Sequence, residues 1–195
     1  MMVGEEDNMG VGQTNEAPGE LELVRRFVNT RDVEEGSDEL DGPDSLLGWF
    51  VGMELLDDGA TADERDLERS LALREGLRSM LLANNGEGVE PVDLRELNRA
   101  AGSVCLRVRF DKDGRPALQP ETPGVSAALG RILAAVVRAR AEGIWGRLKV
   151  CPNDACQWAF YDRSKNRSGK WCTMEVCGNR MKARAFRQRQ SAHKG

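Results

Sequence analysis

Four cysteines near the end of the chain constrain its structure more than any other feature. They form two C-x4-C pairs separated by fifteen residues: Cys151 and Cys156, then Cys172 and Cys177. Four thiolates at paired spacing can bind Zn²⁺ at about 2.3 Å per sulfur and can fold a short segment that lacks a hydrophobic core. Pro, Asn, Asp and Gly, which are typical of turns, lie within or directly after the pairs. The spacing therefore predicts one structural zinc ion per chain, which joins two distant turns.

Disulfides, inert buried thiols and an iron–sulfur cluster are the alternatives for these cysteines. Residues 1–20 contain five acidic side chains and no apolar stretch typical of a secretory signal, and the total of five cysteines is odd. Both observations favour a reducing, cytoplasmic location, where paired cysteines bind metal more often than each other. We expect the fifth cysteine, Cys105, to be a small buried thiol on a strand. The single histidine, His193, lies in the polar C-terminal tail and is not an expected ligand.

Charge is distributed unevenly along the 195 residues. Residues 146–195 carry twelve Lys and Arg against three Asp and Glu, a net charge of +9, whereas residues 1–145 carry sixteen against twenty-nine, a net charge of −13. This asymmetry favours a basic binding module attached to an acidic body, with internal docking of the two as the alternative. No stretch approaches the ~18 apolar residues of a membrane helix, so we expect no membrane partner.

Hydrophobic periodicity predicts a mostly helical N-terminal domain. Met1 to Pro18 is rich in Gly, Glu, Asp and Asn and is expected to be disordered. Apolar residues at helical spacing then predict helices that begin near Leu21, near Pro43, after Thr61, at Val92 and at Gly124. Thr61 and Glu64 have the spacing of a capping box for the third of these helices, and Asn84-Asn85-Gly86 is expected to end it.

One segment of the N-terminal domain alternates instead with the period of a strand. Val104, Leu106, Val108 and Phe110 are expected on one face of it, and Asp111 to Gly114 forms a turn into a second strand around Ala117 to Gln119. A hairpin among helices predicts an α+β fold. We expect three parts: a disordered tail (1–18), an acidic, mostly helical domain with one β-hairpin (19–145), and a small finger (146–195).

The cysteine-rich segment itself predicts a short strand, a basic loop and a helix. Trp158 and Phe160 favour the strand after the first pair, residues 163–169 are polar and basic, and the helix is expected to run from Cys177 to about Gln190. A strand, loop and helix joined by two turns through a four-cysteine zinc site is similar to a treble-clef finger. The aromatic residues, including Trp171, are expected to form its miniature core.

The same residues resemble a known family. The run from Trp158 to Cys172, followed by Cys177-Gly178-Asn179-Arg180, is similar to the CGNR zinc finger, named for these last four residues. Upstream, segments 27–31, 45–49 and 106–110 resemble the ABATE domain that commonly precedes this finger. The resemblance implies a bacterial, stress-related transcription regulator. One position departs from the pattern, because Arg25-Arg26 precede Phe27 where the family usually has an apolar and an acidic residue.

Nucleic-acid binding is the function that these features favour most. Arg180, Arg184 and Arg187 follow i, i+4, i+7 spacing and would form one stripe on the terminal helix. Further phosphate contacts are expected from the loop residues Arg163, Lys165, Arg167 and Lys170. We therefore predict that the protein binds duplex DNA through the finger. RNA binding, protein contact or a purely structural finger remain alternatives, since basic patches are neutral to sequence.

The N-terminal domain offers a second candidate site. Asn29, Thr30 and Arg31 at a helix end, together with Trp49, are candidates for a pocket that binds a small molecule or a protein partner. A structural role is the alternative, because Asn and Thr commonly end helices and a single Trp on an apolar face usually belongs to the core. We expect no enzyme, since four thiolates would fill every ligand position of the metal and no catalytic motif is present.

Overall fold

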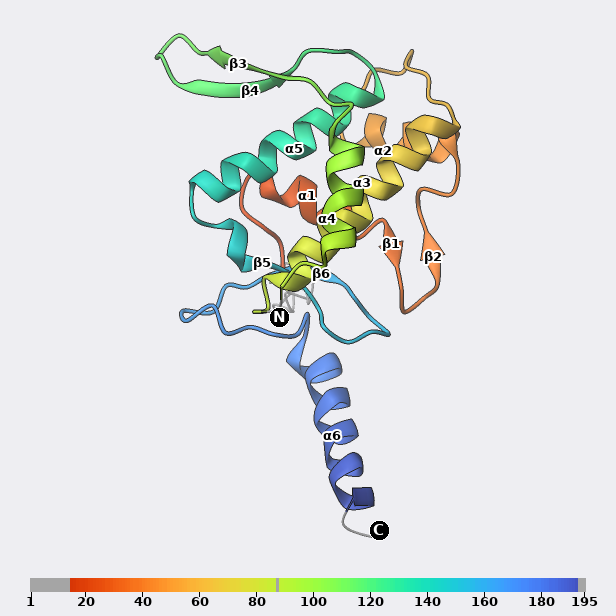
Figure 1. Ribbon diagram of the computed structural model, residues 1–195, viewed down its shortest axis with the longest axis vertical. Helices are drawn as coiled ribbons and strands as arrows, with labels where there is room; N and C mark the ends of the chain where they lie inside the picture. The colour runs from red at the N-terminus through yellow and green to blue at the C-terminus, as the bar shows by residue number, and fades with distance from the viewer. Residues whose placement is uncertain (1–14, 87, 193–195) are drawn as a thin grey trace, which may run out of the picture.

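Helices form most of the protein, whose computed structural model describes residues 15–86 and 88–192 (Figure 1). The elements in order are α1 (Leu21–Val28), β1 (Arg31–Asp32), β2 (Ser37–Asp38), α2 (Pro43–Gly52), α3 (Glu64–Ala83), α4 (Pro91–Ala101), β3 (Leu106–Phe110), β4 (Pro116–Pro120), α5 (Val125–Ala141), β5 (Leu148–Val150), β6 (Ala159–Tyr161) and α6 (Asn179–Ala192). A 3-10 turn (Trp145–Arg147) precedes β5, and a π-helical turn (Met174–Gly178) precedes α6. The strands pair antiparallel in sequential order. The predicted α+β class is therefore confirmed.

The core lies between α1, α2, α3 and α5. The apolar stripe predicted for the first helix is confirmed, because Leu21, Val24, Phe27 and Val28 are all buried. The ring of Phe27 lies 5.6 Å from that of Trp49 on α2, between centroids. Burial of each such side chain contributes about 1.5–3 kcal/mol. None of the helices within the described ranges is both long and apolar enough to cross a membrane.

The start of α3 differs from the capping box expected at Thr61 and Glu64. The N-cap residue is Asp63, whose carboxylate accepts a hydrogen bond of 2.9 Å from the backbone N–H of Asp66. The Asp66 side chain accepts in return from the Asp63 backbone N–H. The helix therefore starts two residues later than a cap at Thr61 would place it, because Asp63 and Asp66 satisfy the free donors of its first turn.

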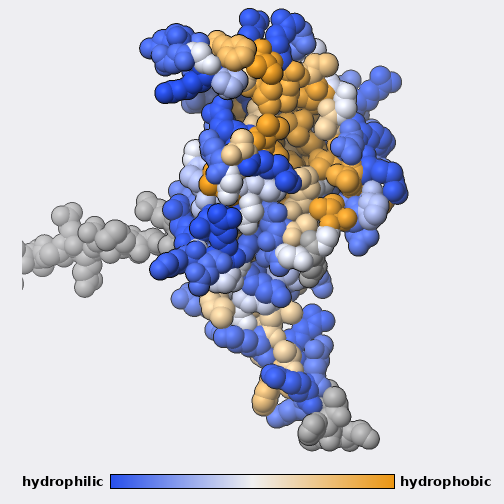
Figure 2. Space-filling model, turned by 60° about the vertical axis from the view of Figure 1, so that its left-hand side comes forward, coloured by the Kyte–Doolittle hydropathy of each residue, from blue (hydrophilic) through white to orange (hydrophobic). Residues whose placement is uncertain are grey.

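The predicted hairpin is formed by β3 and β4, with Val108 opposite Leu118 and Phe110 opposite Pro116. The hairpin is only partly covered: Leu106 lies against Gly130 of α5 and Leu118 is partly buried, whereas Val108 and Phe110 are 55 % and 70 % exposed. Apolar side chains gather on the face of the protein that carries α5 and this hairpin (Figure 2). Cys105, just before β3, is exposed. The prediction of a buried thiol there was wrong.

Residues 15–18, the end of the tail expected to be disordered, pack on the cysteine-rich segment. The carbonyl of Asn15 accepts a 3.1 Å hydrogen bond from the Tyr161 N–H, and the Asn15 side chain donates to the Cys172 carbonyl at 3.0 Å. Ala17 is buried. The expectation of disorder therefore does not hold for these four residues, because Asn15 and Glu16 form hydrogen bonds with the finger, and Ala17 and Pro18 form them with the first turn of α1. The rest of the expected tail, residues 1–14, lies outside the described residues.

The small sheet of the finger belongs to the same core as the helices. The side chains of Leu148 and Val150 on β5 and of Ala159 on β6 are fully buried in the main hydrophobic cluster, together with Tyr161. β5 and β6 lie directly beneath the helical body, and α6 extends away from it (Figure 1). The finger is therefore built onto the helical domain and not merely tethered to it.

Polar side chains also cross this boundary. Asn29 at the end of α1 donates to the Ala159 carbonyl at 3.0 Å and accepts from the Ala159 N–H at 2.7 Å. The buried guanidinium of Arg78 on α3 donates to the carbonyls of Val28 (2.7 Å) and Gln157 (2.9 Å). Hydrogen bonds to buried carbonyls are costly to leave unmade. These contacts fix the orientation of the finger on the helices.

Candidate metal centre

The four predicted ligands, Cys151, Cys156, Cys172 and Cys177, come together in one cluster. Their sulfur atoms all lie within 4.8 Å of one another. The Cys156–Cys172 and Cys172–Cys177 sulfur distances are both 3.6 Å. A tetrahedral zinc site with 2.3 Å bonds has edges of about 3.8 Å. The donor set and its size therefore fit a single tetrahedral metal ion.

The first turn positions Cys151 and Cys156 directly after β5. The carbonyl of Asn153 accepts hydrogen bonds from the N–H groups of Cys156 (2.8 Å) and Gln157 (3.1 Å), which closes the turn. The N–H of Cys151 donates to the Trp158 carbonyl at 2.9 Å and so returns the chain toward β6. The Asn153 side chain is buried and donates to the Cys177 sulfur at 3.7 Å. Such a donor orients a metal-binding thiolate and stabilises its charge.

The geometry of the second turn explains why glycine and asparagine follow Cys177. Gly178 lies so close to its neighbours that an added Cβ atom would approach the Met174 sulfur to 2.3 Å and the Trp171 ring to 3.2 Å. The side chain of Asn179 donates to the Glu175 carbonyl at 3.0 Å. The expected helical start at Cys177 is replaced by the π-helical turn, and α6 begins only at Asn179. This turn presents the buried sulfur of Cys177 to the other three.

The alternatives to a single ion fit this geometry less well. A disulfide requires sulfurs about 2.05 Å apart, and all five cysteines are free. An iron–sulfur cluster assigns different cysteines to different irons and spreads them over a larger volume. Within the thiol cluster, hydrogen bonds from Cys156 and Cys172 lower the pKa of Cys151, whereas donating these hydrogen bonds to Cys151 raises the pKa of Cys156 and Cys172.

A buried ion pair organises the basic loop that follows β6. The ammonium of Lys149 donates to the Asp162 carboxylate at 2.8 Å and to the carbonyls of Arg167 (2.7 Å) and Gly169 (2.8 Å), which uses all three of its donors. Asp162 in turn accepts from the N–H groups of Ser164 and Gly169. An added Cβ at Gly169 would lie 2.7 Å from an Asp162 oxygen, so the loop needs glycine at this position.

The ionisation of Asp162 follows from these contacts. Burial by itself raises the pKa of this carboxyl group, but hydrogen bonds from Lys149 and Ser164 and the charge of Lys149 outweigh it and lower the pKa below its usual 3.8. Sequence reasoning missed both Lys149 and Asp162. The signal was a lysine at the centre of an apolar strand, since Leu148 and Val150 flank it.

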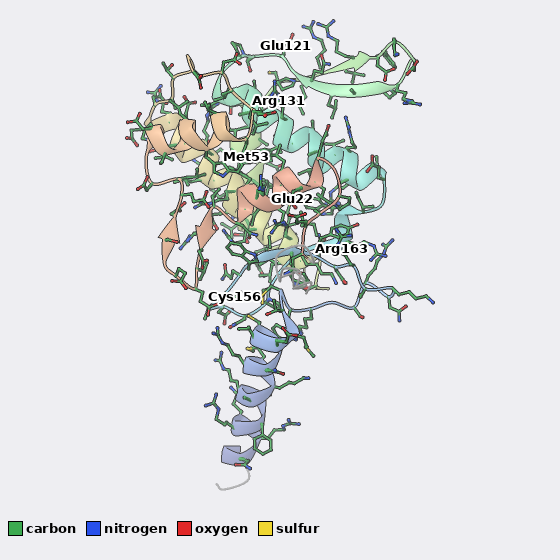
Figure 3. The ribbon with its side chains drawn as sticks, turned by 180° about the vertical axis from the view of Figure 1, so that it is seen from behind. Glu22, Met53, Glu121, Arg131, Cys156 and Arg163 are labelled. Carbon is green, nitrogen blue, oxygen red and sulfur yellow. The ribbon has the colours of Figure 1, made fainter. Side chains whose placement is uncertain are left out.

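The seven basic residues predicted to bind nucleic acid lie at the end of the protein that carries the cysteines. In the loop, Arg163 donates to the Glu16 carbonyl at 2.9 Å, Lys170 lies over the Trp171 ring at 5.6 Å, and Lys165 and Arg167 are exposed. Figure 3 shows Cys156 beside the start of α6 and Arg163 on the other side of the finger, nearer the helical body. The loop residues are therefore anchored by their backbone while their charges face solvent.

On α6, the arginine spacing places Arg180, Arg184 and Arg187 on one side of the helix. Arg184 and Arg187 are exposed, whereas Arg180 pairs with Glu34 in the loop between β1 and β2 at 2.5 Å. Every side chain from Lys182 to Gln190 is exposed, and Phe186 is 56 % exposed, so this part of the helix has no face packed on the finger.

The four residues predicted to line a pocket have different environments. Asn29 and Trp49 both line a cavity described below. Thr30 is buried, and its hydroxyl donates to the Phe27 carbonyl and accepts from Arg74. Arg31 is about half exposed and lies 3.8 Å from Glu75. Thr30 and Arg31 therefore hold the local structure, and neither lines that cavity.

A compact four-thiol centre on a small antiparallel sheet, followed by a helix, defines a zinc finger, here joined to a helical domain. Residues 147–190 match the family "CGNR zinc finger". Residues 21–143 match ABATE, the family described as "Putative stress-induced transcription regulator". This second match covers more than half of the chain, so the protein belongs to the ABATE family, with a CGNR zinc finger after it. Both resemblances are thereby confirmed. No curated protein matches the chain.

Proposed function

We propose that the protein is a DNA-binding transcription regulator, whose finger holds one Zn²⁺ per chain and whose helix α6 contacts duplex DNA. The observation that supports this most is the exposure of α6. Its fourteen residues include five Lys and Arg and no Asp or Glu. A helix of this length without a packed face is marginally stable in water. A partner with negative charge and a groove would supply the ionic contacts and the packing surface that α6 lacks.

Duplex DNA fits these properties. Its major groove admits an α-helix, and phosphates on either side accept hydrogen bonds from guanidinium groups. The stripe of Arg180, Arg184 and Arg187 would meet one phosphate backbone, and the anchored basic loop would add contacts beside it. The fixed Lys149–Asp162 pair supports this role, because a loop already ordered loses less entropy on binding.

The acidic body opposes binding to any polyanion. Glu34 forms an ion pair with the guanidinium of Arg180, and residues 1–145 have a net charge of −13. DNA must therefore displace Glu34 and overcome the repulsion, which lowers affinity for nonspecific sites. We further propose that the protein is not an enzyme and acts in the cytoplasm, since four thiolates leave no open metal position for a substrate. RNA or a protein partner is the runner-up for α6.

A salt titration tests this proposal. Zinc-loaded wild type, an Arg184→Ala, Arg187→Ala variant and a control Arg65→Ala, Arg95→Ala variant are compared for binding to genomic DNA fragments. Each neutralised phosphate contributes about 0.9 to the log–log salt slope, so losing two contacts should flatten it by roughly two units. The control variant removes the same number of positive charges, but from exposed positions on the acidic body. An equal change in the control, an unchanged slope in the α6 variant, or tighter binding to RNA hairpins would refute the assignment.

A further inference from the structure

A cavity lies where α1 and α2 meet the finger, and neither the metal nor the proposed DNA contacts use it. Its volume is about 370 Å³, within the range of about 300–1,000 Å³ typical of small-molecule sites. The lining includes Trp49, Met53, Trp158, Arg25, Arg26 and Glu39. Met53 and the neighbouring Glu22 are visible on the side of the protein shown in Figure 3.

The walls of this cavity are held in place from both sides. Trp49 packs edge-on against Phe50 at 5.5 Å between ring centroids and is half-buried against the main core. Trp158 packs on the metal centre, and its carbonyl accepts the N–H of Cys151. Asn29, which also lines the cavity, joins α1 to β6 through its two hydrogen bonds with Ala159. The cavity is therefore preformed, which reduces the entropy lost on binding.

One guanidinium in the cavity has donors to spare. Arg25 forms a two-point ion pair with Glu22, at 2.8 and 2.6 Å, and this pair neutralises the charge of Arg25. Arg26 lies 3.7 Å from the same carboxylate, donates to the Met53 sulfur at 3.5 Å, and has a side chain that is 57 % exposed. A thioether is a weak acceptor. Arg26 can therefore bind an oxyanion without breaking a strong contact.

We propose that this cavity binds a small aromatic carboxylic acid. Its ring would pack on Trp49, Trp158 and Met53, and its carboxylate would accept hydrogen bonds from Arg26. Aromatic surfaces favour a flat apolar group, and a guanidinium recognises a carboxylate through paired donors. Glu39 also lines the cavity and its charge opposes a carboxylate ligand, but Glu39 is exposed, so water weakens this repulsion without abolishing it. The proposal does not depend on DNA binding, since each property is measured on the free protein.

Calorimetry with three probes of one shape tests the charge requirement. The zinc-loaded full chain is titrated with 2-naphthoate, 2-naphthalenemethanol and 2-naphthylmethylamine. We expect 2-naphthoate to bind with a dissociation constant below roughly 1 mM and about five-fold or more tighter than the neutral and cationic probes. No detectable binding of 2-naphthoate, or equal binding of all three probes, overturns the proposal.

Two substitutions with opposite expected effects locate the site. Arg26→Gln should weaken 2-naphthoate binding by about five-fold, and Glu39→Gln should strengthen it, because it removes the carboxylate from the lining. The matched control Arg95→Gln, on the exposed surface of α4, should leave it unchanged. A folding defect cannot produce both directions, and zinc content is measured for each variant. Unchanged affinity in Arg26→Gln, or the same change in Arg95→Gln, refutes the assignment.

Discussion

At the scale of single residues, the buried Lys149–Asp162 pair determines the shape of the basic loop. Both side chains are less than 7 % exposed, and both make contacts with backbone groups of the loop as well as with each other. A buried pair gives modest net stability, but removing one partner leaves an uncompensated charge, which costs about 3–5 kcal/mol. Loss of one member of the pair therefore lowers the stability by more than the intact pair adds to it.

We predict that Lys149→Met destabilises the finger and loosens this loop. The midpoint of thermal unfolding should fall, and trypsin should cleave the loop faster after Arg163, Lys165 and Arg167, because the Asp162 charge loses its partner. Lys165→Met is the matched control, since Lys165 is exposed on the same loop, and the comparison uses cleavage after Arg163 and Arg167, which both variants keep. If the two variants melt and digest alike, the pair does not hold the loop.

At the scale of elements, a second buried arginine attaches the β1–β2 hairpin to α3. Arg74 donates to both oxygens of Asp38, at 2.6 and 2.7 Å, and to Thr30 at 3.0 Å. Burial opposes the ionisation of Asp38, but the hydrogen bond and charge of Arg74 outweigh it and lower its pKa below the usual 3.8. Because Glu34 lies in this hairpin, Arg74 also determines where the partner of Arg180 is held.

The lowered pKa of Asp38 predicts a pH dependence of stability. Since the folded pKa lies below the unfolded value, the carboxylate contributes fully above about pH 4 and loses its contribution as the pH falls through the folded pKa. Asp38→Asn should therefore cost about 1–3 kcal/mol at pH 6 and less at pH 3. The lower part of that range is expected because the side chain is 31 % exposed. Urea unfolding at both pH values measures this, with Asp57→Asn as control, and an equal cost at both would contradict it.

The accuracy of the sequence-based predictions varies from element to element for physical reasons. The stripe of α1 and the four cysteines could be predicted because periodicity and spacing are local. The exposure of Phe110 could not, since alternation shows which residues share a face and not whether another element covers it. Contacts such as Asn29 with Ala159 join residues 130 positions apart. Nothing in the sequence near either residue indicates such a contact.

At the scale of the whole molecule, the small sheet that carries the metal centre shares the main hydrophobic core with the helical domain, whereas the cysteines form a second, adjoining cluster with Phe160. Leu148 and Val150 are fully buried within the main core, and Asn84 and Asn85 at the end of α3 donate to the Leu148 carbonyl (2.8 Å) and the Val150 carbonyl (2.7 Å). The sequence predicted that residues 19–145 form one domain and residues 146–195 a separate finger. That prediction stays open, but a fragment ending near Trp145 would expose the core surface that β5 and β6 cover, so we expect its stability to be low.

Loss of the metal should therefore destabilise the whole chain and not only the finger. Structural zinc sites contribute about 10–16 kcal/mol of apparent binding free energy. Entire domains are stable by only about 5–15 kcal/mol. We predict that a Cys172→Ser, Cys177→Ser variant loses zinc and that its helices melt at a much lower temperature than those of the wild type. Elemental analysis measures the zinc, and far-ultraviolet circular dichroism follows the helices.

The shared core also predicts how the wild type unfolds. Tryptophan fluorescence reports on Trp145 and Trp158 near the boundary, on Trp49 in the helical domain and on Trp171 in the finger. It should change at the same temperature as the helical signal, because the two parts unfold as one cooperative unit.

Cys105→Ser is the matched control for the Cys172→Ser, Cys177→Ser variant, since Cys105 is exposed and lies outside the cluster, and it should keep both zinc and melting temperature. Full zinc retention in the double variant would exclude the assigned ligands. An unchanged helical transition after zinc loss would instead show that the acidic domain folds without the finger.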